Sequence, residues 1–197
     1  MRRISVALGL VGVVGLATLA LPAAGEHTGQ GDPNDTRGPL DVRVVRLSHE
    51  DGPPTWRIGT FARWSARKIW DRGYLIVELD TKRDEGADHL AVVRSDGRRL
   101  LGDLYRLRRD GKQARIGALR AGKAGARGAW VAVPLHKLSI GASRTSYRWS
   151  VLTSWTAAGC ERACFDLVPD AGAVEQPLPG VTPTPSPTVS PSPTPSP

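Results

Sequence analysis

The side chains best suited to chemistry lie in a short polar stretch near the start of the chain. Four of them offer oxygen ligands within ten residues: Asp32, Asn34, Asp35 and Asp41. Clustered carboxylate and amide oxygens are the ligands that calcium prefers, so we predict a structural calcium site here. The EF-hand pattern is not met, because position 37 is Arg where that loop needs Gly. The alternative is that Asp and Asn only form turns beside Pro and Gly.

A second candidate site is a strongly basic stretch in the middle of the chain. Residues 94–127 hold nine Arg and two Lys against three Asp. Such a local excess of positive charge could hold an anionic polymer, such as wall teichoic acid or an acidic polysaccharide. The arginines that we assign to this polymer-binding patch are Arg94, Arg98, Arg99, Arg106, Arg108 and Arg109.

The alternative for this stretch is a solvated hairpin, because strict strand alternation divides these arginines between two faces. No known nucleic-acid-binding motif accompanies the patch, so we expect no sequence-specific binding of nucleic acid.

Six tryptophans in one chain of this size could serve as core or as stacking platforms for sugar rings. Trp130, Tyr147 and Trp149 stand at alternating positions typical of residues that face a core. For Trp56, Trp64 and Trp70 the sequence favours the core and leaves the platform open.

No motif in the sequence indicates catalysis. The sequence contains no nucleophile elbow, no pair of histidines at metal-binding spacing and no glycine-rich phosphate loop. We therefore expect a protein that is not an enzyme and that has no cofactor apart from the calcium described above.

The start of the chain has the three parts of a secretory signal. Two arginines precede a long apolar run, which ends in small residues at about position 24. The alternative is a retained membrane anchor, since the run is long enough to span a bilayer. We expect cleavage, no membrane span afterwards, and a secreted protein, with association with the cell wall as one option. Cleavage would lower the formal net charge from +8 to +6.

The two cysteines, Cys160 and Cys164, fit an exported protein. An even number of cysteines in an oxidising compartment favours a disulfide, and the few other ligands nearby are poor support for zinc. Only three residues separate the cysteines, so the entropic gain from this bond is expected to be modest.

The central part of the chain reads as short strands. Alternating or β-rich runs occur at about 40–47, 56–62, 74–79, 90–93, 100–107, 116–119, 130–133 and 145–155. Turn signals at 95–97 and 110–111 predict two hairpins. Ser65 could cap one helical turn, which would place Ile69 and Trp70 toward the core. We predict an all-β fold, an antiparallel, jelly-roll-like β-sandwich of about eight strands with one or two short helical turns.

The expected organisation has four parts: a signal peptide at 1–24, a polar segment at 25–38, the β-sandwich at 39–176, and a tail at 177–197. Residues 181–197 contain only Val, Thr, Pro and Ser, a composition that cannot form a core and is typical of disorder.

Three stretches carry a resemblance to known domains: DPNDTRGPLD at 32–41, WDRGYLIVELDT at 70–81 and VPLHKL at 133–138. In this order they resemble secreted actinobacterial β-sandwich domains of unassigned function. More distantly, they are similar to the DOMON and family-9 carbohydrate-binding-module group. The resemblance covers roughly residues 32–176 and implies a β-sandwich. Relatives that bind haem use Met and His ligands, and the only methionine here is Met1, so axial Met ligation is excluded.

These observations together favour a non-catalytic accessory or binding module for the cell envelope or for an extracellular polymer, either a glycan or an anionic polymer. The alternative is a structural or protein-interaction domain without a small ligand. The sequence does not indicate the oligomeric state.

Overall fold

The structure, a computed structural model, describes residues 28–49, 52–84, 86–108, 110–156, 160 and 162–179. The predicted signal peptide and most of the predicted tail lie outside these residues. The described chain is almost entirely antiparallel β-structure, which confirms the predicted fold class. No helix in the described part of the chain is long and apolar enough to span a membrane.

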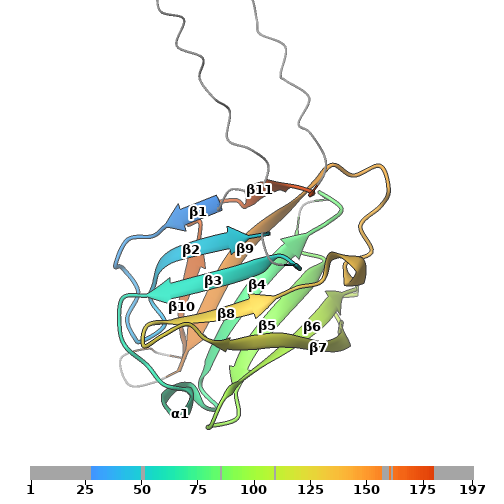
Figure 1. The fold of residues 1–197 in the computed structure, drawn as a ribbon. Coiled ribbons are helices and arrows are strands. Elements are labelled where there is room, and N and C mark those ends of the chain that lie inside the picture. Colours follow the sequence, from blue (N-terminus) through green and yellow to red (C-terminus); the bar gives the residue numbers. More distant parts are fainter. Residues whose placement is uncertain are drawn as a thin grey trace, which may run out of the picture.

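Eleven strands form two layers that face each other (Figure 1). The first layer contains β1 (Thr28–Gly31), β2 (Val42–Ser48), β3 (Thr55–Thr60), β8 (Gly128–Ala132) and the end of β7 (Gln113–Lys123). The second layer contains the start of β7 together with β6 (Leu100–Leu107), β5 (His89–Ser95), β4 (Gly73–Asp80), β9 (Ser146–Trp155), β10 (Cys164–Val168) and β11 (Val174–Pro177).

The long strand β7 joins the two layers. It pairs with β6 as far as Leu119 and with β8 from Arg120 onward. The strand order is β1-β2-β3-β8-β7-β6-β5-β4-β9-β10, with β11 also pairing with β9. Because β7 continues from one layer into the other, the sheet is nearly barrel-shaped.

The core lies between the layers and follows the alternation read from the sequence. On β3, Trp56 and Ile58 are buried while Arg57 is exposed. Trp56 meets Tyr147 and Trp149 of the opposite layer edge to face, with ring centroids 6.3 and 6.4 Å apart. These aromatic contacts bury large apolar areas and hold the two layers together.

One or two short helical turns were predicted, and the described residues contain two, α1 (Ala66–Ile69) and the 3₁₀ turn η1 (Leu135–Lys137). Ser65 caps α1 as expected, since its hydroxyl accepts a hydrogen bond from the backbone of Lys68. Ile69 is buried, but Trp70 is 56% exposed, so the prediction that Trp70 faces the core is wrong. The helix ends at Ile69, and Trp70 at its C-cap leaves the helical conformation, with φ −58° and ψ 130°, so it does not continue the buried face of the helix.

Three short strands were not predicted individually: β1, β10 and β11. They have four or five residues each, and β1 has the sequence TGQG, without a β-branched or aromatic pair to mark a strand. These strands lie where the two layers meet opposite β7. Thr28 on β1 donates a hydrogen bond to Gln176 on β11 at 2.7 Å, which bridges the layers there.

Candidate functional site

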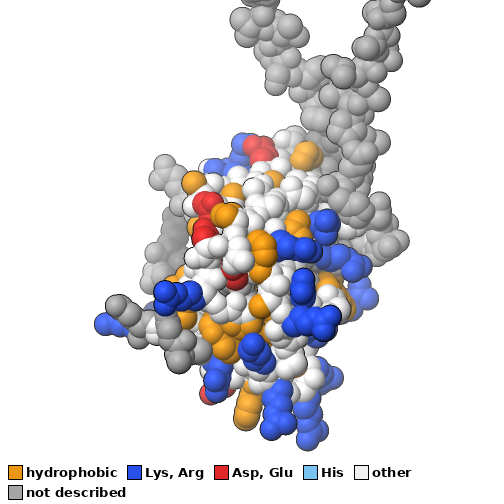
Figure 2. Space-filling model, turned by 90° about the vertical axis from the view of Figure 1, so that its left-hand side faces the viewer, with side chains coloured by type: hydrophobic (Ala, Val, Ile, Leu, Met, Phe, Trp, Pro, Cys, Tyr) orange, Lys and Arg blue, Asp and Glu red, His pale blue; other side chains and the backbone are white. Residues whose placement is uncertain are grey.

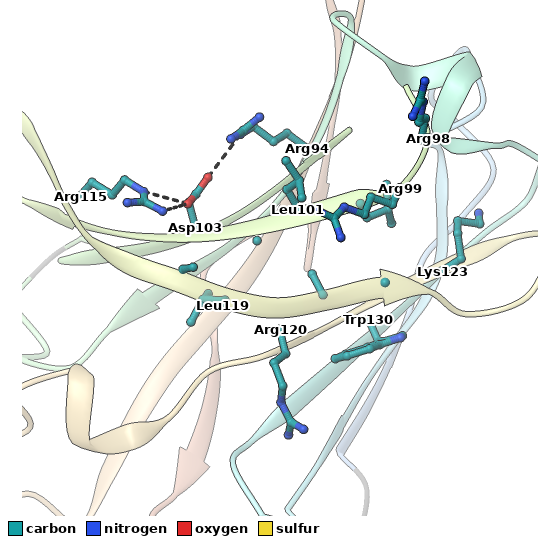
Figure 3. A pocket seen from close by; sticks show the side chains of 15 residues that line it. Arg94, Arg98, Arg99, Leu101, Asp103, Arg115, Leu119, Arg120, Lys123 and Trp130 are labelled. Atoms are coloured by element: carbon teal, nitrogen blue, oxygen red, sulfur yellow. Dashed lines mark hydrogen bonds and ion pairs between the residues drawn. The ribbon is translucent and has the colours of Figure 1, made fainter. Parts of the chain in front are cut away.

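A groove of about 680 Å³ lies beside the point where β7 leaves β6 (Figure 3). The last β6–β7 pair is Gly102 with Leu119, so the start of β6 has no β7 partner. The two strands separate there, and small lining residues such as Ala118 and Ala121 leave space between the larger side chains. The groove therefore follows from the change of strand partner along β7.

The groove is strongly basic. Its lining contains six cationic side chains and one carboxylate, Asp103. The cationic residues are Arg94, Arg98, Arg99, Arg115, Arg120 and Lys123. Positive charges gathered in a concave surface focus the field and attract anions.

Asp103 organises one end of the groove. Its carboxylate lies between Arg94, at 3.2 Å, and Arg115, at 2.6 Å, as Figure 3 shows. Asp103 is buried, while both guanidinium groups remain about half exposed. One carboxylate that orients two guanidinium groups leaves a net positive charge, and it holds both groups in place beside the groove.

A β-bulge places Arg115 at this end. Between the pairs Leu104–Gly117 and Tyr105–Arg115, the strand β7 holds one extra residue, Ile116. Without the extra residue, alternation would turn Arg115 toward the core. The bulge instead brings Arg115 to the same face as Asp103, an arrangement that strict alternation along the sequence does not predict.

The other cationic groups lie toward the opposite end and along the β8 side (Figure 3). In the described part of the chain, the Arg98 and Arg120 side chains form no hydrogen bond or ion pair, so both remain available to a ligand. Arg99 pairs with Asp96 at 3.5 Å, an exposed contact of little energetic value.

Lys123 is held by Trp64. Its ammonium lies 3.0 Å from the ring centroid of Trp64 and donates a hydrogen bond to the Trp64 carbonyl. Burial lowers the pKa of Lys123 to about 8, so the group still carries its charge at neutral pH.

Trp130 also lines the groove, although the sequence predicted it in the core. It is half-buried, and it pairs across the sheet with Arg57 on one side and Gly122 on the other. Directly paired residues share a face, and Arg57 is exposed, so Trp130 points outward. The inward positions of β8 are taken by Ala129 and Val131. From the sequence alone it could not be decided whether Trp130 or its neighbours Ala129 and Val131 face the core.

The outer face beside Trp130 continues the basic surface. Arg57 pairs with Arg46 on β2, so Trp130, Arg57 and Arg46 form one row across three strands. The strands β1, β2, β3 and β8 and the last four residues of β7 contain no Asp or Glu. Figure 2 shows that lysine and arginine outnumber acidic side chains on the side of the molecule it presents.

A second aromatic group lies near the groove, at the β5–β6 turn. The indole of Trp70 packs against Gly97, and Trp70, Tyr74 and Arg94 line a hollow of about 150 Å³. Arg94 lines both this hollow and the groove. An exposed indole beside arginines can stack on a sugar ring or another flat apolar face.

The predicted polymer-binding residues divide between two places. Arg94, Arg98 and Arg99 line the groove. Arg106 instead donates a hydrogen bond to Ser139 at the other end of β6, and Arg108 is exposed near the β6–β7 turn. Arg109 lies outside the described residues. The groove residues that the prediction missed are Arg115, Arg120, Lys123 and Trp130.

The predicted metal ligands lie away from β7, where β2 and β10, near the two ends of the strand order, approach each other. Carboxylate oxygens of Asp32, Asp35 and Asp41 all lie within 4.8 Å of one another. Asn34 lies in the same loop and is exposed. Burial, followed by the charge of Asp166 and other acidic neighbours, raises the pKa of Asp32 to about 7 and that of Asp41 to about 6.

The two cysteines form the expected disulfide, Cys160–Cys164.

Among the histidines, His89 is buried and its Nδ1 lies 2.9 Å from Asp88, which also accepts a hydrogen bond from the Thr81 hydroxyl. The Nε2 atom of His89 is buried and has no hydrogen-bond partner among the described residues. This network has the character of a structural contact in the core.

Comparisons with known protein families, with curated proteins and with solved structures find no match for this chain. The resemblance to actinobacterial β-sandwich domains and to the DOMON group therefore stays a prediction, and the function has to be argued from the groove itself.

Proposed function

We propose that the chain is a secreted, non-catalytic binding module for an acidic glycan polymer of the cell envelope or the extracellular space. The observation that carries the proposal is the groove beside β7, where six cationic side chains and Trp130 surround a space with a single carboxylate. That carboxylate already serves to orient two of the arginines.

The shape of the charged surface favours a polymer over a compact anion. The cationic groups begin at the β5–β6 turn, follow β7, and continue over β8 to Arg57 and Arg46. Neighbouring strands are about 4.8 Å apart, so this surface extends over several repeats of an extended ligand. A small anion would instead need donors that converge on one point.

The tryptophans favour a glycan among the anionic polymers. Trp130 on the groove and Trp70 at the nearby turn both offer part of an indole to the outside. An indole packs on the apolar face of a sugar ring while arginines bind its acidic groups. The Cys160–Cys164 disulfide is compatible with an oxidising, extracellular compartment.

The proposal is tested by co-sedimentation of the full chain with purified cell-wall material and by titration with a soluble polyuronate. Neutral dextran and single-stranded DNA serve as comparison polymers. The proposal predicts binding to the polyuronate and the wall material, and weak binding to dextran. Failure to bind either acidic material at low salt would contradict it. Tighter binding of DNA than of the polyuronate would favour a nucleic-acid ligand for the groove instead.

A further inference from the structure

The inference concerns the seam opposite β7, where the N-terminal segment (residues 28–41) reaches the second layer. Carboxylate oxygens of Asp32, Asp35 and Asp41 come together within 4.8 Å of one another. Calcium binds oxygen ligands at about 2.4 Å, so two ligands on opposite sides of one ion lie at most about 4.8 Å apart. The three oxygens therefore stand at distances that one such ion can bridge.

The burial of Asp41 is an independent sign that something is bound here. Asp41 is only 3% exposed, and its Oδ1 is buried without a hydrogen-bond partner among the described residues. The Oδ2 of Asp32 is also buried without a hydrogen-bond partner among the described residues. Buried carboxylate oxygens nearly always have a hydrogen-bond donor, a cation or a metal as partner.

Within the described residues, no basic side chain neutralises the cluster. In the described ranges, no Lys, Arg or His forms an ion pair with Asp32, Asp35 or Asp41. Asp166 on β10 adds a further negative charge, and it raises the pKa of both Asp32 and Asp41. Like charges held together in this way repel each other, and a divalent cation would turn that repulsion into attraction.

The cluster also lies where the N-terminal segment meets β10 of the second layer. Asp32 follows β1, Asp35 lies in the loop, and Asp41 directly precedes β2. Asp166 stands on β10 in the other layer and accepts a hydrogen bond from the backbone of Val42. An ion bound to the three loop carboxylates would order the loop beside β10, and its charge would attract the Asp166 carboxylate on the side that β7 does not join.

We propose that Asp32, Asp35 and Asp41 bind one calcium ion, which orders the N-terminal segment where it meets the second layer beside Asp166. The ligands are all hard oxygen donors on a loop, which suits calcium better than magnesium, because magnesium demands a tighter octahedral geometry. The site is separate from the groove, and the proposal does not rest on the polymer-binding function.

The test is thermal unfolding of the full chain in EDTA, in about 1 mM CaCl₂ and in about 1 mM MgCl₂, together with calcium titration by calorimetry. We expect calcium to raise the Tm by about 5 °C or more over EDTA, and magnesium to raise it less. Asp41→Asn removes one ligand charge and relieves repulsion, so its Tm in EDTA should equal or exceed that of the wild type while its response to calcium is lost.

Two further variants complete the test. Asp35→Asn, at an exposed ligand that is not expected to affect folding, should weaken calcium binding by about tenfold or more. Asp84→Asn, an exposed carboxylate elsewhere, should keep the wild-type response. A wild-type Tm that is the same in calcium and EDTA would overturn the proposal. So would an unchanged calcium affinity in Asp35→Asn, or a response to magnesium as large as that to calcium.

Discussion

Val42, the first residue of β2, donates its backbone N–H to a carboxylate oxygen of Asp166 on β10 at 2.6 Å, although 124 positions separate the two residues. Both residues are buried. A buried N–H that loses its acceptor costs about 1–3 kcal/mol. This hydrogen bond is therefore one of the contacts that close the two layers opposite β7.

This contact predicts a difference between two variants with the same charge. Asp166→Asn keeps an oxygen acceptor for Val42, whereas Asp166→Ala removes it. We expect Asp166→Ala to be less stable than Asp166→Asn by about 1–3 kcal/mol, measured by urea unfolding in EDTA so that any bound metal is absent. Equal stability of the two variants would show that the hydrogen bond contributes little.

The contact between Trp130 and Gly122 supports a second prediction, on the shape of the groove. A Cβ atom at Gly122 would lie 2.9 Å from the Nε1 atom of the Trp130 indole, so Gly122→Ala has to displace the ring. We expect weaker binding of a polyuronate and a changed tryptophan emission, with little loss of stability because the indole can move toward solvent.

Gly117→Ala on the same strand is the matched control for that experiment. A Cβ atom at Gly117 meets only the end of the Lys137 side chain, at 3.8 Å. This variant should bind the polymer as the wild type does. If Gly122→Ala also keeps wild-type affinity, the Trp130 ring does not contribute to the groove.

A third prediction concerns pH and the buried carboxylate of Asp88. Burial alone would raise the pKa of Asp88, but hydrogen bonds from His89 and from the hydroxyl and backbone of Thr81 outweigh it and lower the pKa to about 2. Lys82 also lies near, at 3.5 Å. Because the folded pKa lies below the ordinary value of 3.8, the ionised group stabilises the fold at higher pH, and this contribution is lost as the pH falls from about 4 to 2.

One pKa unit corresponds to about 1.4 kcal/mol, so Asp88→Asn should cost about 2 kcal/mol at pH 6. Near pH 2 the variant and the wild type should have similar stability. Denaturant unfolding at a series of pH values checks this, with the exposed Asp84→Asn as control. A stability difference that stays constant between pH 6 and pH 2 would contradict the role assigned to Asp88.

Features that depend on neighbouring residues could be predicted from the sequence. The eight strands β2 to β9, the Ser65 cap, and the carboxylates of residues 32–41 each depend on a pattern within about ten residues. Asp166 could not be added to that acidic cluster, because its place beside Val42 depends on how β10 packs, far along the chain.

The groove was predicted only in part, for two local reasons. The bulge at Ile116 reverses the face of Arg115, and a single extra residue leaves no signal in strand alternation. Trp130 faces out because β8 presents Ala129 and Val131 to the core, whereas the size of the indole favours the opposite choice. The change of partner along β7, which opens the groove, depends on the sheet as a whole.

The most direct test of the polymer-binding account is the affinity for a polyuronate over a salt series, for the wild type and two double variants. Arg98→Ala/Arg120→Ala removes two groove charges that have no ion-pair partner among the described residues. Arg108→Ala/Lys112→Ala removes two charges near the hairpin turn at the other end of β6 and β7. The account predicts that the groove variant binds about tenfold more weakly at low salt and with a shallower salt dependence, while the hairpin variant behaves as the wild type. Equal losses in the two variants would show that only net charge matters, and would contradict a binding site in the groove.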